Sequence, residues 1–168
     1  MTSGLQEEIR RVLDRQGTTD PTFTSITCRL VENFDAKIGV VYTLDAGTGM
    51  LKLRCHCGIP KEHAEKLRFF PVGKDLPGKV AASRKPLQGF HLNDANDSST
   101  STPSNPSPSS KFSPEFDIFT TGTIFVPMLH DNTLLGVLGI GKSFHHEYAP
   151  DEIAFLSSIA HLIAAYLK

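Results

Sequence analysis

The fold is decided by one stretch in the last third of the chain: Gly122-Thr-Ile-Phe-Val-Pro-Met-Leu-His130, Asp131-Asn132, Thr133-Leu-Leu-Gly-Val-Leu-Gly-Ile-Gly141. Two apolar runs are joined there by a two-residue turn, and this pattern predicts a β-hairpin. The residues from about Pro150 to Lys168 follow, and their apolar positions recur at helical spacing. The chain is therefore expected to end in a strand pair that an amphipathic helix covers.

The composition is that of an ordinary soluble domain. The chain has 168 residues, of which 39% are hydrophobic and 21% charged, and this length suffices for one domain with its own core. A formal net charge of -1 argues against a general attraction to nucleic acid or to an anionic membrane. No apolar run approaches the roughly 20 residues that cross a bilayer, and the polar N-terminus has no signal-peptide core. We expect a cytoplasmic protein.

Two helices and a first hairpin are expected upstream of this stretch. Apolar residues at helical spacing predict a helix over about 4–16. A second helix should begin at Asp20-Pro21, because Asp20 suits an N-cap and Pro21 suits the first helical position. The run 37–44 is rich in β-branched residues, and the run 50–57 alternates apolar and polar residues. These two runs are expected to pair as a hairpin.

Shorter segments fill the middle of the chain, where short helices are expected at about 61–67 and 75–84. Residues from about 93 to 112 are almost all Ser, Thr, Asn, Asp and Pro, which predicts a disordered insertion within a single domain spanning 1–168. The clustered hairpins predict an α+β fold with a central antiparallel β-sheet of about six strands. We expect the N- and C-terminal helices on one face of this sheet and the short helices on the other.

Several short motifs occur in an order that is typical of one known family. They are Gly58-Ile59-Pro60, Pro71-Val72-Gly73-Lys74, Leu76-Pro77-Gly78-Lys79-Val80-Ala81, Lys85-Pro86, Val126-Pro127-Met128, Leu135-Gly136-Val137-Leu138 and Tyr148-Ala149-Pro150-Asp151-Glu152. In this order they resemble the motifs of the GAF domain, a small sensory module, over most of the chain. The stretch from Pro71 to Ala81 looks like the family's "PVGKGxxG" entry into its pocket helix, and the stretch from Leu135 to Leu138 looks like its "xGVL" strand.

This resemblance implies a GAF/PAS-like arrangement, with a small-molecule pocket between the sheet and the mid-chain helices. GAF domains bind cyclic nucleotides, bilins, haem or amino-acid derivatives. Backbone N–H groups at the start of a helix attract anions, and here lysines flank that start. The candidate ligand-binding residues are Lys74, Asp75, Gly78, Arg84, His91, Thr121 and Thr123.

The chain departs from the specialised branches of the family. In the cyclic-nucleotide branch an Asn-Lys pair is expected, but Gly141 precedes Lys142 here. No cysteine follows Cys57, so neither a covalently attached bilin nor the mid-domain cysteines of the free methionine sulfoxide reductases are expected. We therefore predict no evident cofactor and an unknown small-molecule ligand.

The chain has three cysteines, and two of them stand in the motif Cys55-His56-Cys57. Alternation along a strand would place Cys55 and Cys57 on the face of Leu51 and Leu53, with His56 on the other face. The three side chains could not then coordinate one metal ion, and no second Cys/His pair at zinc-ligand spacing occurs. An odd number of cysteines in a reducing compartment argues against a disulfide framework. We expect these residues to be core thiols and predict no metal site.

The last helix carries two apolar stripes, of which one should face the sheet. The second stripe could be covered by the first helix or by a partner subunit, and the family commonly forms dimers through its terminal helices. The candidate dimer-interface residues are Leu5, Ile9, Val12, Phe155, Ile159, Leu162 and Tyr166.

No convincing catalytic constellation is visible, so we predict a binding module rather than an enzyme. The expected function is a sensory or regulatory domain in signal transduction, which would act as a homodimer and signal to a partner protein in trans. One alternative is a thiol redox enzyme of the free methionine sulfoxide reductase type. Another is a ligand-free dimerisation scaffold.

Overall fold

The computed structural model describes residues 2–17, 19–66, 68–88, 122–142 and 146–167. Their elements follow one another in the order that the sequence predicts, with hairpins and helices alternating. They are α1 (Thr2–Gln16), α2 (Asp20–Asn33), β1 (Ile38–Asp45), β2 (Met50–Cys57), α3 (Lys61–Lys66), β3 (Phe69–Pro71), α4 (Asp75–Ser83), β4 (Leu87–Gln88), β5 (Thr123–His130), β6 (Thr133–Gly141) and α7 (Pro150–Leu167). The predicted insertion at about 93–112 lies outside the described residues.

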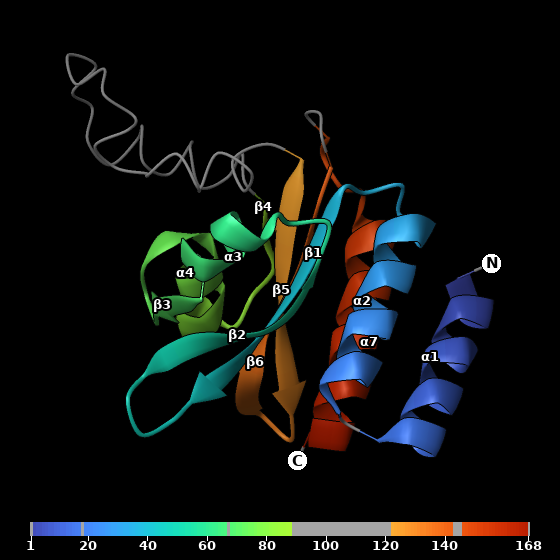
Figure 1. The fold of residues 1–168 in the computed structure, drawn as a ribbon, viewed down its shortest axis with the longest axis horizontal. Helices are drawn as coiled ribbons and strands as arrows, with labels where there is room; N and C mark the ends of the chain where they lie inside the picture. The colour runs from blue at the N-terminus through green and yellow to red at the C-terminus, as the bar shows by residue number, and fades with distance from the viewer. Residues whose placement is uncertain (1, 18, 67, 89–121, 143–145, 168) are drawn as a thin grey trace.

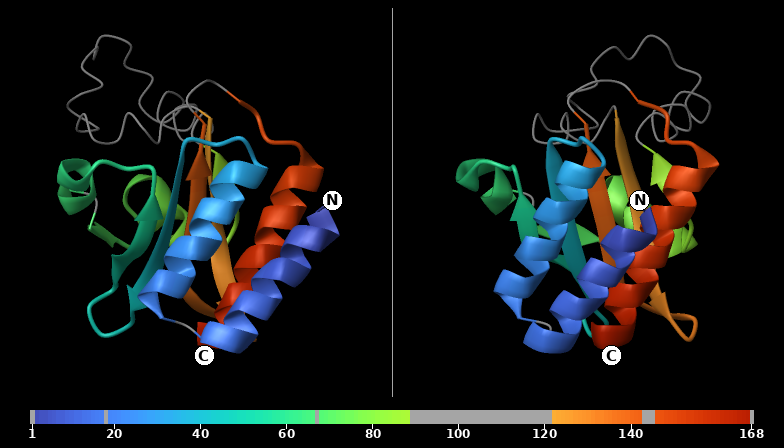
Figure 2. Two further views of the ribbon diagram at one scale, coloured as in Figure 1. Left: turned by 45° about the vertical axis from the view of Figure 1, so that its right-hand side comes forward. Right: turned by 90° about the vertical axis from the view of Figure 1, so that its right-hand side faces the viewer.

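The strands form one antiparallel, six-stranded sheet in the order β3-β2-β1-β6-β5-β4. The long helices α1, α2 and α7 lie on one face, and the short helices α3 and α4 lie on the other (Figure 1; Figure 2). The α+β fold and the division of the helices between the two faces are therefore confirmed. No helix in the described ranges is long and apolar enough to cross a membrane.

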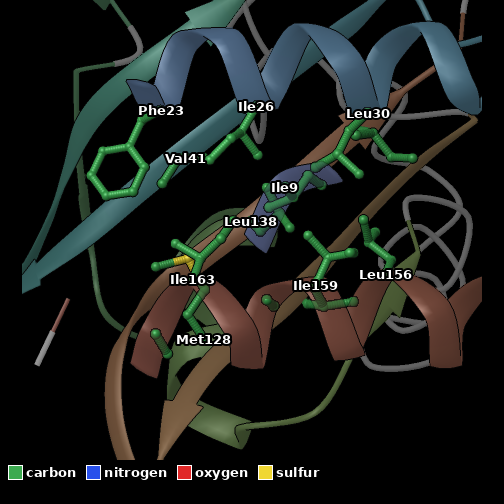
Figure 3. Packing of buried hydrophobic residues seen from close by; sticks show 14 of the residues in the cluster. Ile9, Phe23, Ile26, Leu30, Val41, Met128, Leu138, Leu156, Ile159 and Ile163 are labelled. Carbon is green, nitrogen blue, oxygen red and sulfur yellow. The ribbon is translucent and has the colours of Figure 1, made fainter. Parts of the chain in front are cut away.

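The face under the long helices holds the larger core, which we call the helix-side core. It consists of Leu5, Ile9, Leu13, Phe23, Ile26, Leu30, Phe34, Val41, Cys55, Ile124, Val126, Met128, Leu138, Ile140, Tyr148, Leu156, Ile159, Ala160, Ile163 and Ala164. Figure 3 shows how α2 and α7 bring their apolar stripes together over the strands. Each helix buries residues three and four positions apart, as an amphipathic helix must.

The opposite face holds a second core, which we call the α4-side core. It consists of Ile38, Val40, Tyr42, Leu51, Ile59, Ala64, Phe70, Leu76, Val80, Ala81, Phe125, Leu134 and Val137. Strand alternation explains the division, because Val41 points to the long helices while Val40 and Tyr42 point to α4.

The start of α2 differs from the sequence prediction by one residue. Thr19 is the N-cap, with extended backbone, and its hydroxyl accepts a hydrogen bond from the Thr22 N–H. Asp20 is the first helical residue, and its carboxylate pairs with Arg54 Nε at 2.6 Å. Asp20 is thus an ion-pair partner of β2 instead of a cap.

The prediction for the faces of β2 is wrong, because a β-bulge interrupts the strand. Val41 pairs with Cys55 and Tyr42 pairs with Leu53, so Arg54 is an extra residue. A bulge shifts the alternation by one position. Cys55 consequently lies in the helix-side core, whereas Leu51 lies in the α4-side core.

The expectation that all cysteines would be free thiols is also corrected. Cys28 of α2 and Cys57 at the end of β2 form a disulfide, with a Cα–Cα distance of 5.5 Å. Cys55 is free and buried. The bulge explains this pairing, because it directs the side chains of Cys55 and Cys57 to the face that α2 covers.

Candidate functional site

The α4-side face of the sheet is the candidate ligand-binding face. Its floor is formed by β1, β6 and β5, and α4 packs over β5 and β6. Tyr42, Phe70 and Phe125 lie together beneath α4. The Tyr42 ring meets the Phe70 ring edge-on, with centroids 5.5 Å apart, and lies 6.4 Å from the Phe125 ring. The centre of this face is therefore filled by aromatic side chains.

Glycines of β6 make room for the side chains of the neighbouring strands. A Cβ on Gly139 would lie 2.4 Å from the Phe125 ring, so this ring occupies the space above the glycine. Gly141 pairs with Ile38 on one side and with Thr123 on the other. A Cβ there would lie 2.8 Å from Thr123 Oγ1. The glycine-rich strand thus serves close side-chain packing rather than a phosphate-binding turn.

Two hydroxyl groups are buried on this otherwise apolar face. Tyr42 is fully buried, and burial raises the pKa of its phenol well above the ordinary value, so the phenol stays protonated. Thr123 is 1% exposed and stands at the edge of the face where β1, β6 and β5 meet. Apolar walls with a few placed polar groups are typical of small-molecule sites.

The predicted ligand residues do not form a single group. Lys74, the N-cap of α4, is exposed, and Asp75 is the first residue of that helix. Gly78 is buried against Pro71, where a Cβ would lie 2.3 Å from the Pro71 carbonyl oxygen. These residues mark the start of α4, while Thr123 lies on the sheet below.

Arg84 lies at the other end of α4, about 13 Å along a helix of nine residues. It adopts the left-handed conformation, and its Nη1 donates a hydrogen bond to the Asn132 carbonyl at 2.6 Å. Asn132 and Asp131 form the predicted two-residue turn, and both have positive φ, as a type I′ turn requires. Arg84 thus ties α4 to the β5–β6 hairpin. The predicted residues His91 and Thr121 lie outside the described residues.

Comparison with known proteins agrees with this geometry. The sequence profile of the GAF domain matches residues 18–168. This chain belongs to the GAF domain family. No curated protein matches the sequence.

Solved structures share the fold of this GAF domain. The GAF domain of a phosphoenolpyruvate-protein phosphotransferase from Coxiella burnetii superimposes with a TM-score of 0.77 and 21% identity, over 99% of this chain and 92% of that one. The corresponding domain from Acinetobacter has a TM-score of 0.74 and 10% identity, over 99% and 92%. Free methionine-R-sulfoxide reductase from Neisseria meningitidis, solved with its substrate, has a TM-score of 0.71 and 15% identity, over 99% and 87%. At these identities the likeness concerns the fold.

The cysteines of this GAF domain all lie on the face away from α4. Cys55 packs in the helix-side core, and the disulfide joins β2 to α2. Burial is the main reason that the pKa of the Cys55 thiol rises to about 11, although a hydrogen bond with Thr27 opposes the rise. A thiol of this kind is a weak nucleophile near neutral pH.

The segment before α7 is held by polar contacts that serve the fold. The Gln88 side chain accepts a hydrogen bond from the Tyr148 N–H at 2.7 Å, and the Tyr148 hydroxyl donates to the Gly122 carbonyl at 2.8 Å. Burial raises the pKa of Tyr148 far above its ordinary value. The Glu152 carboxylate accepts from the Ala149 N–H at 2.8 Å and lies 3.2 Å from His146 Nε2. Sequence reasoning missed Gln88, because a single Gln in a short strand carries no signal.

Lys142, which matches the lysine of the cyclic-nucleotide branch, serves α2 here. Its ammonium donates to the Phe34 carbonyl at 2.5 Å, at the C-terminal end of α2, where a cation is favoured by the helix dipole. The neighbouring His146 lies beside Glu152. Within the described ranges, no group of three potential metal ligands comes together.

The candidate dimer residues divide into two sets. Leu5, Ile9 and Ile159 are buried within the chain, because α1 packs on α2 and α7 (Figure 2). The first helix therefore supplies much of the cover that the second stripe of α7 requires. The half-buried candidates are Val12, Phe155, Leu162 and Tyr166. The Tyr166 hydroxyl contacts Asp14 of α1, and Phe155 lies 5.8 Å from Phe34.

Proposed function

We propose that this GAF domain is a small-molecule-binding regulatory domain whose ligand lies on the α4-side face of the sheet, next to Thr123. The observation that carries the proposal is the buried Thr123 hydroxyl at the glycine-lined edge of an apolar face, in a family of sensory modules. An apolar or aromatic ligand group would extend the packing of Phe125, and a polar group would face Thr123.

Ligand binding would be transmitted through the sheet to the long helices. The two cores share β1, β5 and β6, so a shift of these strands changes the packing on both faces. Half-buried Val12, Phe155, Leu162 and Tyr166 would then form a homodimer contact, and a partner protein would read its change in trans. The domain would act in the cytoplasm.

Native mass spectrometry of the full chain, purified from the cells that express it, tests ligand binding. We expect a stoichiometric extra mass, which weakens or disappears in Thr123→Val. This variant keeps the side-chain volume and removes the hydroxyl. Thr24→Val is the matched control, because Thr24 is half-exposed on α2, on the other side of the sheet from α4, and its hydroxyl donates to the Asp20 carbonyl of its own helix. An extra mass that persists unchanged in Thr123→Val contradicts this position for the ligand.

A ligand-free dimerisation scaffold is the second candidate function, and the three aromatic rings that fill the centre of the α4-side face favour it. The same spectra separate the two functions. A dimer without an extra mass supports the scaffold, and a monomer without an extra mass rules out both the scaffold and the helix-dimer signal.

A thiol redox enzyme is the third candidate, since a solved neighbour is a free methionine-R-sulfoxide reductase. The position of all three cysteines away from α4 argues against it. Incubation with free methionine-R-sulfoxide and dithiothreitol is the direct test. Formation of methionine that is lost in Cys57→Ser would establish the enzyme.

A further inference from the structure

The contact between α2 and β2 contains a chemical site that ligand binding does not use. We propose that Cys28 and Cys57 form a reversible dithiol–disulfide pair that responds to the balance of small-molecule thiols and disulfides, of which glutathione is the type. In the oxidised state this pair clamps α2 to the connection between β2 and α3. The proposal is independent of the ligand proposed above.

The pair is the last of three cross-links along the α2–β2 contact. Arg54 Nε bonds the Asp20 carboxylate at 2.6 Å, and the Arg54 guanidinium lies 5.0 Å from the centre of the Phe23 ring. Thr27 and Cys55 form the second link, with Oγ1 and Sγ 3.3 Å apart. The disulfide is the third link, and it is the one that a redox reaction can open.

Exposure distinguishes the pair from the remaining thiol. Cys28 and Cys57 are each half-buried, so a small thiol can approach the bond. Cys55 is 6% exposed and lies against Thr27. Access and thiolate character govern exchange, so the reactive sulfurs are those of the pair.

The position of Cys57 connects the clamp to the ligand-binding face. Gly58 follows with a φ of +85°, and a Cβ there would lie 2.1 Å from the Lys37 carbonyl oxygen, so the chain turns tightly against β1. Ile59 then enters the α4-side core, and α3 begins at Lys61. Opening the disulfide would release one anchor of this turn, and the release would reach α3.

The exchange balances with glutathione disulfide as the oxidant. One thiolate of the pair attacks a sulfur of glutathione disulfide, which forms a mixed disulfide and expels one glutathione thiolate. The second thiolate attacks the protein sulfur of that bond and expels the other glutathione. Two protein thiols lose two electrons and two protons, and two glutathione molecules form. Reduction is the reverse sequence.

Thiol counting in glutathione buffers tests the pair. The full chain is equilibrated at a series of ratios of glutathione to glutathione disulfide, and exchange is then quenched with acid. The free thiols are labelled with N-ethylmaleimide in denaturant, and the number of labels is read from the protein mass by mass spectrometry. We expect wild type and Cys55→Ser to gain two labels together at one ratio, in both directions of titration. Cys28→Ser and Cys57→Ser should show no such paired step.

Hydrogen exchange on the same samples tests the clamp. We expect amides of residues 58–66 to exchange at least tenfold faster in the reduced protein, while β5 and β6 stay protected. Wild type alone provides this comparison, so the result does not depend on the folding of a variant. In the thiol count, the proposal is overturned if the number of labels does not change with the glutathione ratio, if the two-label step requires Cys55, or if a stable glutathione adduct forms in place of the internal disulfide. In the hydrogen-exchange experiment, it is overturned if residues 58–66 exchange at the same rate in the oxidised and reduced proteins.

Discussion

The two faces of the sheet are stabilised in different ways. On one face, three long helices bury aliphatic stripes, and the strands contribute mainly Val, Ile, Leu and Met. On the other face, α3 and α4 are short, and aromatic side chains of the strands fill much of the space, with the Phe125 ring above Gly139. A long helix can cover a sheet by itself, whereas a short helix needs the strands to supply the volume. The face with short helices is consequently the one on which we expect a ligand to replace a side chain.

The largest effect should come from removing one large side chain from each core. Phe125→Ala removes an aromatic ring between β6 and α4, and we expect a loss of about 3–5 kcal/mol in the free energy of unfolding. Ile159→Ala, the matched variant in the helix-side core, should lose about 2–5 kcal/mol. Urea unfolding measures both losses. A small aromatic such as indole should raise the melting temperature of Phe125→Ala and leave that of Ile159→Ala unchanged. Equal stabilisation of both variants would remove the distinction between the faces.

A smaller effect should come from filling the space above a glycine. Gly139→Ala places a methyl group against the Phe125 ring, and overpacking of this kind costs about 1–3 kcal/mol. The same change in a Phe125→Leu background should cost less, because the ring is gone. The coupling between the two changes, measured by urea unfolding of the four proteins, checks the contact. Additive losses would mean that the ring does not lie above Gly139.

The β5–β6 hairpin and the long helices were predictable because their signals are local. Turn chemistry at Asp131-Asn132 and helical spacing are properties of neighbouring residues, and the structure confirms both. The bulge at Arg54 has no local signal, because it arises from how β2 pairs with β1. One unforeseen residue was enough to reverse the predicted faces of Cys55 and Cys57.

The candidate site was predictable only in part for the same reason. The sequence placed Lys74 and Gly78 at the start of α4, and the buried Thr123 on the facing strand. Tyr42 and Phe125 were missed as members of the site, since only the register of three strands brings their rings together. The sequence predicts Arg84 in the same pocket as Lys74 because Arg84 flanks the next strand, but a nine-residue helix separates the two residues.

The smallest effect concerns the start of α7 on the helix side. Burial by itself would raise the pKa of Glu152, but the Ala149 N–H, His146 and Lys142 together hold the pKa below its ordinary value of 4.5. A lowered pKa in the folded state stabilises the protein above the unfolded pKa, and this contribution is lost as pH falls through the folded value. We expect Glu152→Gln to cost about 0.5–1 kcal/mol at pH 7, as for other helix-capping groups, and less below pH 4.5.

The control for this prediction is Asp151→Asn, which removes a charge from the same helical turn at an exposed position. It should change the free energy of unfolding by less than Glu152→Gln. Thermal unfolding between pH 3 and pH 8 compares the two variants. Equal pH dependence in both would show that charge near the helix start matters and that the Ala149 contact does not.

The bulge at Arg54 also bears on how the chemistry of such a domain can change. In a regular ladder Arg54 would pair with Val41 and Cys55 with Val40, so Cys55 and Cys57 would both point toward α4 without a change in either cysteine. Both thiols would then lie on the α4-side face instead of beside α2. In this fold the pairing of a single strand residue therefore decides which face two unchanged cysteines occupy, and no substitution at the cysteines themselves could alter that choice.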